Sequence, residues 1–314
     1  MRRWHHFLLA GATGVALTMP VSTVAAQRTH VLIVAGLSGA PNFKTAFTQA
    51  IATTRSTARE RWAVSDSSFI ALTEDSLPSA ASQGQSTKAN IAAAFLRLSK
   101  RVSAGDVVLV MLLGHGSGEG PGSKVNLPGP DATATEYASW IAPFAQQQVV
   151  FVNAATGSGD FVPVMSKTGR VVITATRTAM ERNESEFLGV FTKALSSEEA
   201  DADKDGRLSV LEAFRYARAE VAKSYERTNR LLTEHAVLSD SIIAGRITFA
   251  GKATAANPRV AALIAERQVL ESQVAALRAR KASMAADAYD AELERLLLSI
   301  AEKTQAIKAA GGDK

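Results

Sequence analysis

The sequence predicts an α/β protein, in which a mostly parallel β-sheet with flanking helices is followed by a C-terminal α-helical hairpin. Short apolar runs alternate with segments whose apolar residues recur at helical spacing, a pattern typical of parallel α/β sheets. One run, Asp106–Leu113, is unbroken, which indicates a strand buried on both faces at the centre of the sheet. After the small residues of Ala250–Pro258, the composition changes to Ala, Leu, Glu, Arg and Lys, which favours a separate helical unit.

The other elements of the sheet follow from the same patterns. Besides Asp106–Leu113, the predicted strands are Thr29–Ala35, Phe69–Leu72, Val149–Val152 and Val171–Ala175. The predicted helices are Ala89–Val102, Phe187–Leu195 and Val210–Ala222.

The C-terminal segment carries heptad spacing, in two stretches. The first stretch has an apolar residue every seven positions at Leu263, Leu270, Leu277 and Met284, and the second at Leu293, Ile300 and Ile307. A break near Ser283–Asp287 between two helices of about 25 residues each predicts an antiparallel hairpin over residues 259–309. The heptads leave open whether this hairpin packs on the main domain or pairs with another copy of the chain.

The first 26 residues are typical of a secretory signal peptide. Arg2 and Arg3 form a positive start, Phe7–Val21 is an apolar stretch too short to span a bilayer, and Val24-Ala25-Ala26 fits a cleavage site. We therefore expect an exported chain, periplasmic or secreted, with a signal peptide at 1–26, a main domain at 27–250 and a linker at 251–258. The alternative is that the segment stays uncleaved as an anchor.

Charge and composition exclude several function classes. Loss of Arg2 and Arg3 with the signal peptide lowers the formal net charge from +5 to +3, and no long basic run is present. Nucleic-acid binding therefore has little support, and we expect no membrane span after signal removal. The chain has no cysteine, which excludes disulfides, thiolate metal sites and cysteine nucleophiles.

Two predicted strands end in residues that could form a hydrolytic site. The central strand runs into Gly114-His115-Gly116, and Val149–Val152 runs into Asn153-Ala-Ala-Thr156-Gly-Ser-Gly159. Because the carboxyl ends of neighbouring parallel strands meet at one edge, His115 and Thr156 are expected to lie close together. A hydroxyl nucleophile needs a base oriented by another group, normally a carboxylate, and Glu119 is the acidic residue next to the His115 turn in sequence. The alternative for His115 is a hydrogen-bonded turn histidine.

These motifs resemble the legumain/caspase group of cysteine peptidases, legumain most closely. The resemblance covers Thr29 to Arg218 and lies in separated motifs that occur in the family's order. The matching segments are Ala35-Gly-Leu-Ser-Gly39 with Asn42-Phe-Lys44, Val107–Leu113 with His115-Gly-Ser117, Ala155-Thr-Gly-Ser-Gly159, and Ile173-Thr-Ala-Thr-Arg177 with Asn183-Glu-Ser-Glu186.

The resemblance implies a role for each matching residue. His115 would be the general base, the N–H of Gly116 an oxyanion donor, and Thr156 would stand where the family has its catalytic cysteine. A one-residue gap would put Ala155 there instead, but Thr156 keeps Ser158-Gly159 in register. The residues implied in substrate binding are Asn42, Lys44, Thr174 and Thr176, where legumains have arginine in place of Lys44.

A separate twelve-residue segment, 201–212, fits the EF-hand calcium loop. Its candidate ligands, at the six pattern positions, are Asp201, Asp203, Asp205, the carbonyl of Arg207, Ser209 and Glu212, with Gly206 at the turn. A structural Ca²⁺ ion is therefore predicted. The alternative is an acidic turn in which Ser209 and Glu212 form a helix capping box. Glu234-His235, by contrast, has no second ligand at helical spacing, and His235 is interpreted as a packing or surface residue.

Three hypotheses follow for function. The first is a non-catalytic module of peptidase-like fold that binds a peptide or protein partner and self-associates through the hairpin. The second is a hydrolase that uses Thr156 with His115. The third is a calcium-stabilised structural protein in which neither site acts.

Overall fold

The structure is a computed structural model, and it describes residues 27–75, 82–203, 207–249 and 258–311. The predicted signal peptide, Asp205 and most of the predicted linker lie outside the described residues. Among the described residues, no helix has both the length and the apolar character needed to cross a bilayer.

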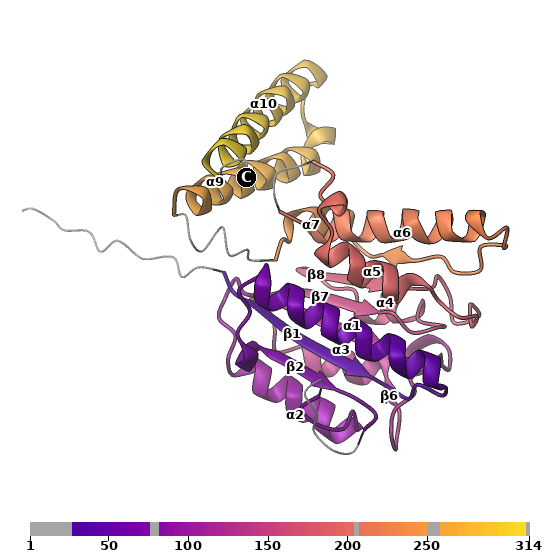
Figure 1. Cartoon of the computed structure of the whole chain (residues 1–314). Helices are drawn as coiled ribbons and strands as arrows, with labels where there is room; N and C mark the ends of the chain where they lie inside the picture. The colour runs from indigo at the N-terminus through magenta and orange to yellow at the C-terminus, as the bar shows by residue number, and fades with distance from the viewer. Residues whose placement is uncertain (1–26, 76–81, 204–206, 250–257, 312–314) are drawn as a thin grey trace, which may run out of the picture.

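A six-stranded sheet forms the centre of the main domain, with the order β2-β1-β3-β7-β8-β9 (Figure 1). All neighbouring strands pair in parallel except β8 and β9, which are antiparallel. The six strands are β1 (Thr29–Ala35), β2 (Phe69–Leu72), β3 (Val107–Leu113), β7 (Gln148–Asn153), β8 (Arg170–Thr174) and β9 (Val237–Leu238). The predicted fold class and the central place of β3 are confirmed.

Helices cover both faces of this sheet (Figure 1). Alternate residues of β1 enter different cores: Val31 and Ile33 pack with α1, α5, α6 and α7, whereas Leu32 and Val34 pack with α2, α3 and α4. This alternation is what a strand buried on both sides requires. The helices are α1 (Pro41–Glu60), α2 (Lys88–Ser99), α3 (Ala134–Ile141), α4 (Phe161–Met165), α5 (Phe187–Ser196), α6 (Val210–Arg227) and α7 (Ser241–Arg246).

A second, small antiparallel sheet follows the central strand. It comprises β4 (Gly116–Ser117), β5 (Lys124–Val125) and β6 (Ala132–Thr133), in that order. It ties the segment after His115 to α3, whose first turn is closed by a capping box of Thr133 and Glu136.

The differences from the sequence prediction have physical causes. β3 begins at Val107, because Asp106 closes the preceding turn by accepting hydrogen bonds from the N–H groups of Arg28 and Ser103. Helix α1 was not predicted, although Pro41 at its start is a favoured first residue and Phe47 and Ile51 form its buried face.

The C-terminal segment is an antiparallel hairpin of α9 (Pro258–Ala279) and α10 (Ala286–Gly311), with a 3₁₀ turn at Lys281–Ser283. The predicted hairpin and the position of its break are confirmed, but α9 already begins at Pro258, where the linker was expected to end. The helices pack on each other through two clusters separate from the main core: Val274, Leu277, Tyr289 and Leu296 near the turn, and Val260, Ile264 and Ile307 at the far end.

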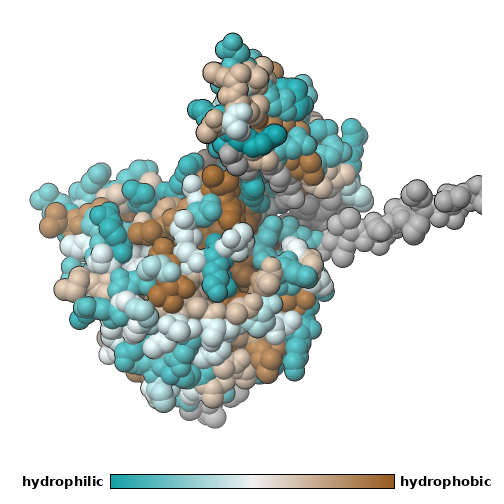
Figure 2. Space-filling view, turned by 180° about the vertical axis from the view of Figure 1, so that it is seen from behind, coloured by the Kyte–Doolittle hydropathy of each residue, from teal (hydrophilic) through white to brown (hydrophobic). Residues whose placement is uncertain are grey.

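Polar contacts join the hairpin to the main domain. Arg246 donates to the carbonyl of Glu271 at 3.0 Å, and Lys308 donates to the carbonyl of Asp203 at 2.9 Å. Figure 2 shows hydrophilic and hydrophobic residues interspersed over one face, with a hydrophobic group just below the hairpin.

Candidate functional site

Four adjacent strands bring one residue each to the carboxyl edge of the main sheet. In sheet order, Glu74 follows β2, Ser38 follows β1, His115 follows β3 and Thr156 follows β7. This edge is where open α/β sheets commonly bind ligands. The predicted meeting of His115 and Thr156 is present, since the two residues form an isolated parallel β-bridge.

The imidazole of His115 has a defined partner and a defined stacking contact. Its Nε2 lies 3.0 Å from the carbonyl oxygen of Ser38. A carbonyl only accepts hydrogen bonds, so Nε2 carries the proton in this contact. Phe43 meets the ring edge-on, with centroids 4.7 Å apart and planes at 84°. The orienting group is thus a main-chain carbonyl. Glu119, by contrast, is exposed and lies 3.9 Å from Arg182.

The hydroxyl of Thr156 is turned toward the main chain of the histidine turn. Its Oγ1 accepts a hydrogen bond from the N–H of Gly116 at 3.4 Å, and the residue is only 7% exposed. Among the described residues, no hydrogen bond joins the His115 ring to this hydroxyl. A Cβ at position 116 would lie 2.3 Å from the carbonyl oxygen of Thr156, so only glycine allows this approach. His115, Gly116 and Thr156 are therefore brought together, without a formed dyad.

The turn after Thr156 is held by Thr176. Its Oγ1 accepts hydrogen bonds from the N–H groups of Ser158 and Gly159 at 2.7 and 3.2 Å. Thr174 donates to the carbonyl of Thr176 at 2.8 Å, and both threonines are buried. Their predicted part in substrate binding stays a prediction. In this structure their hydroxyls fix the turn that presents Thr156.

The other two residues implied in substrate binding, Asn42 and Lys44, lie exposed in the first turns of α1. Lys44 Nζ bonds Asp75 at 2.6 Å and lies 3.7 Å from Glu74. The hydrogen bond to Asp75 raises the pKa of Lys44. A ligand that used this ammonium group would compete with two carboxylates, and the role of both residues stays a prediction.

Ser38 and Glu74 are part of the site, and sequence reasoning gave neither a role. Glu74 accepts two hydrogen bonds from Ser38, at 3.0 Å from its N–H and 2.6 Å from its hydroxyl. Burial raises the pKa of Glu74, but these bonds and the charge of Lys44 outweigh burial and lower it overall. The available signal was its position directly after the predicted strand Phe69–Leu72.

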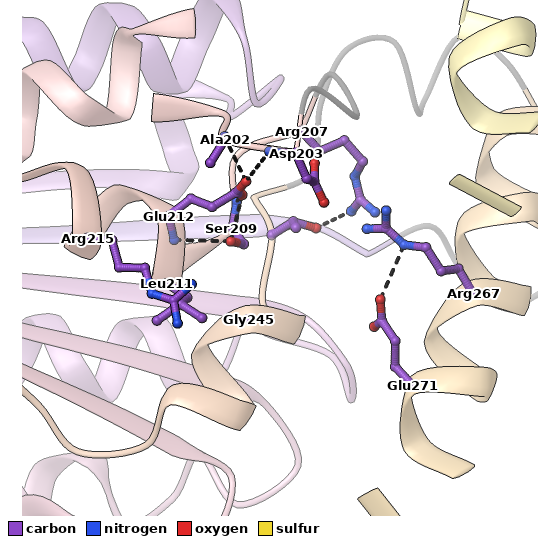
Figure 3. Close-up of a pocket in the computed structure, with 11 residues that line it drawn as sticks. Ala202, Asp203, Arg207, Ser209, Leu211, Glu212, Arg215, Gly245, Arg267 and Glu271 are labelled. Atoms are coloured by element: carbon purple, nitrogen blue, oxygen red, sulfur yellow. Dashed lines mark hydrogen bonds and ion pairs between the residues drawn. The ribbon is translucent and has the colours of Figure 1, made fainter. Parts of the chain in front are cut away.

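The second candidate site, at residues 201–212, lies beside the hairpin (Figure 3). The carboxylates of Asp201, Asp203 and Glu212 each offer an oxygen, and these lie within 4.8 Å of one another. Glu212 also forms the alternative arrangement, a capping box with Ser209 at the start of α6. Its other oxygen accepts from the N–H groups of Ala202 and Asp203 at 2.9 and 3.2 Å.

A cavity of about 340 Å³ adjoins this segment between α6, α7 and α9. Its lining includes Arg207, Thr248 and Arg267, and in the view of Figure 3 the side chains of Arg207 and Arg267 point toward one another. Arg207 donates to Thr248, and Arg267 pairs with Glu271 at 3.3 Å. The side chain of Arg207 is thus used in packing, while its carbonyl was the predicted ligand.

Glu234 and His235 have structural partners. Glu234 is buried and accepts from the N–H groups of Glu186 and Phe187 at 2.8 and 3.2 Å, so it caps the start of α5. His235 contacts Glu181 through its ring Nδ1 at 3.0 Å, and Glu181 in turn accepts from the N–H of Gly157 through its carbonyl. The interpretation of His235 as a packing or surface residue agrees with these contacts.

Comparison with known proteins gives distant likenesses. No protein-family model and no curated protein matches the chain. Protein GSU0716 from Geobacter sulfurreducens aligns with 71% of this chain and 99% of its own, at 11% identity and a TM-score of 0.44. The caspase drICE aligns with 69% of this chain and 88% of its own, at 10% identity and a TM-score of 0.38. At these scores, the fold class rests on the chain's own strand order and flanking helices.

Proposed function

We propose that this chain is an exported domain of the legumain/caspase type that binds a peptide or protein ligand at the carboxyl edge of its sheet without cleaving it. The order of the sequence motifs and the meeting of His115 with Thr156 support the family. The observation that carries the non-catalytic part is the hydrogen bond from Gly116 N–H to Thr156 Oγ1 at 3.4 Å. In this contact the group expected to stabilise an oxyanion faces the alcohol, and the alcohol has no bond to the base.

The chemistry of the alcohol supports the same conclusion. A thiol is partly ionised near neutral pH, whereas a hydroxyl requires a base within hydrogen-bonding reach. Loss of general-base catalysis alone costs about 10²- to 10⁴-fold in rate. Thr156 is also nearly buried, which hinders attack on a bound substrate.

Binding and cleavage can be separated with one peptide library. The purified protein is tested for binding to immobilised peptides and for cleavage of fluorogenic versions, together with the Thr156→Ala, His115→Ala and Asn42→Ala variants. Gln49→Ala, also exposed on α1, is the matched control. We expect binding without cleavage, unchanged binding by Thr156→Ala and Gln49→Ala, and about tenfold weaker binding by Asn42→Ala or His115→Ala.

The alternative function, hydrolysis by Thr156 with His115, is favoured by one observation, the fixed orientation of the His115 ring. Cleavage by the original protein that is lost in both Thr156→Ala and His115→Ala would establish this alternative. Absence of both binding and cleavage across the library would contradict either function.

We also propose that segment 201–212 holds a structural Ca²⁺ ion. Oxygen ligands from Asp201, Asp203 and Glu212 suit this hard cation. Ligation by both oxygens of Glu212 would replace the hydrogen bonds that they now accept from Ala202, Asp203 and Ser209. We therefore expect weak affinity, of the order of 10⁻⁴–10⁻³ M, sufficient in an extracellular compartment.

Calcium binding is tested by calorimetric titration of the protein and of the Asp203→Asn variant. Heat of binding that the variant loses supports the site. If no heat of binding is measured up to millimolar Ca²⁺, the calcium site is contradicted, and the role of Glu212 is the capping box with Ser209.

Self-association through the hairpin belongs to the same proposal. Val269, Leu297 and Leu298 are exposed apolar residues of α9 and α10 that a second hairpin could cover. Sedimentation of the protein and of a Leu297→Lys, Leu298→Lys double variant tests it, because a dimer that persists in the variant would contradict this surface.

A further inference from the structure

The ring of His115 has one nitrogen in use and one available. Nε2 donates to the carbonyl of Ser38 at 3.0 Å. Nδ1 has no hydrogen-bond partner among the described residues, and in this tautomer it carries a lone pair. The tautomer therefore decides whether His115 offers a ligand at the carboxyl edge of the sheet an acceptor or a donor.

Ser38, which holds Nε2, is itself fixed on two sides. It is 6% exposed, and its N–H and its hydroxyl both donate to the carboxylate of Glu74, at 3.0 and 2.6 Å. The following residue, Gly39, has φ +71, a conformation that a side chain would strain. This turn directs the Ser38 carbonyl toward the imidazole.

The main chain of Glu74 is held by Gln85, on the side away from Ser38. Its carbonyl accepts from the side-chain amide of Gln85 at 3.0 Å, and the Thr73–Gln85 bridge continues the pairing beyond β2. Lys44 approaches its carboxylate at 3.7 Å. The pKa of Glu74 is held low, chiefly by the two bonds from Ser38 against the opposing effect of burial, so the carboxylate is charged at neutral pH.

The contacts from Glu74 to His115 follow the order of the strands in the sheet. β2, β1, β3 and β7 are consecutive in the sheet, so Glu74, Ser38, His115 and Thr156 follow one another along its edge. We propose that Glu74 is a positioning residue for His115: acting through Ser38, it fixes the ring with Nε2–H bound to the Ser38 carbonyl and keeps Nδ1 as the hydrogen-bond acceptor that His115 offers to a ligand.

The inference rests on the proposed function, ligand binding at the carboxyl edge of the sheet, but its test requires no ligand. Nitrogen-15 NMR of histidine-labelled protein gives the tautomer of each imidazole, and comparison with His115→Gln assigns the signals. We expect His115 in the original protein to be in the Nε2–H form, with a slowly exchanging Nε2–H proton. Failure of peptide binding would leave this measurement unaffected.

The variants separate Glu74 from its neighbour. In Glu74→Ala the preference for the Nε2–H form should fall about fivefold, as expected when the single hydrogen bond from Nε2 to the Ser38 carbonyl is lost, and the proton signal should broaden. Ser38→Ala keeps the main-chain bond to Glu74 and should show a smaller change in the same direction. The matched control is Asp75→Asn, because Asp75 binds Lys44 and makes no bond to Ser38.

Two results would overturn the inference. One is an Nδ1–H tautomer in the original protein. The other is a His115 spectrum that both Glu74→Ala and Ser38→Ala leave unchanged. If Glu74→Ala fails to fold, Ser38→Ala and the original protein still decide the question.

Discussion

Replacing Thr156 with cysteine tests whether His115 is placed to act on a group at position 156. The β-bridge between the two residues and the hydrogen bond from Gly116 put the new thiol beside the backbone turn that carries the imidazole. An imidazolium, formed when the imidazole takes up the thiol proton, or another positive group nearby lowers a thiol pKa from about 8.5 to between about 3.5 and 7.5. We expect a thiol pKa of about 6.5 in Thr156→Cys.

The magnitude follows from the ionised fraction. At pH 6 a thiol of pKa about 8.5 is about 0.3% ionised and one of pKa about 6.5 about 24%, a gain of about 75-fold. A thiolate of lower pKa is less nucleophilic, by about eightfold for two units. The net prediction is about tenfold faster reaction with a disulfide reagent at pH 6.

The assay compares Thr156→Cys with the double variant Thr156→Cys, His115→Ala. The chain has no native cysteine, so the introduced thiol is the sole reactive sulfhydryl. Ultraviolet titration of the thiolate gives its pKa, and release of thiopyridone from a dipyridyl disulfide gives its rate. Ser158→Cys, in the same turn but hydrogen-bonded to Thr176, is the control for location.

The reasoning would be refuted by equal thiol pKa values and equal rates at pH 6 with and without His115. Such a result would mean that the ring cannot reach position 156. The legumain/caspase resemblance would then hold for the order of the motifs but not for the placement of His115 beside the side chain at position 156.

Three further predictions concern stability. Burial lowers the pKa of His30 by more than the hydrogen bond to Asp106 raises it, so His30 is protonated more readily in the unfolded chain than in the folded protein. The free energy of unfolding should therefore fall as the pH drops below about 6.5, and urea unfolding of His30→Gln should show a smaller fall between about pH 6.5 and 5. Gly116→Ala should destabilise the protein by about 1–3 kcal/mol because its Cβ meets the Thr156 carbonyl, whereas Gly122→Ala, with open space around it, should change the melting temperature little. Leu277→Ala, in the hairpin core, should lower the free energy of unfolding of the hairpin by about 2–5 kcal/mol and speed amide exchange in α9 and α10 alone. Leu297→Ala, at a half-exposed position, should do neither, and equal exchange in both variants would contradict a separate hairpin core.

Local patterns were sufficient for most of the fold. Phe69–Leu72 and Thr29–Ala35 were predicted with the bounds that β2 and β1 have, because each contains a short apolar run that stops at a polar residue or a glycine, Thr73 after β2 and Gly36 after β1. Helix α1 was missed since its buried face, led by Phe47 and Ile51, is diluted by threonines and alanines. The heptads predicted the hairpin, because its two helices bury their apolar residues mainly against each other.

The residues of the site were predictable only where each stands at the end of a strong strand. His115 and Thr156 could be paired from sequence, since β3 and β7 are long and their carboxyl ends carry distinctive turns. Thr174 and Thr176 lie at the expected place, but their use in holding Ser158 and Gly159 depends on backbone contacts that no spacing reveals.

The partner of His115 shows where sequence reasoning stops. An orienting carboxylate was sought beside His115 in the chain, and Glu119, the nearest acidic residue, points to Arg182 instead. The structure supplies orientation through the sheet: β1 lies between β2 and β3, so Ser38 stands between Glu74 and His115 although 36 and 77 residues separate it from them. Strand order is a tertiary property, and no local pattern near position 115 encodes it. A search for the missing partner of a strand-end histidine should therefore begin with the residues that follow its neighbouring strands.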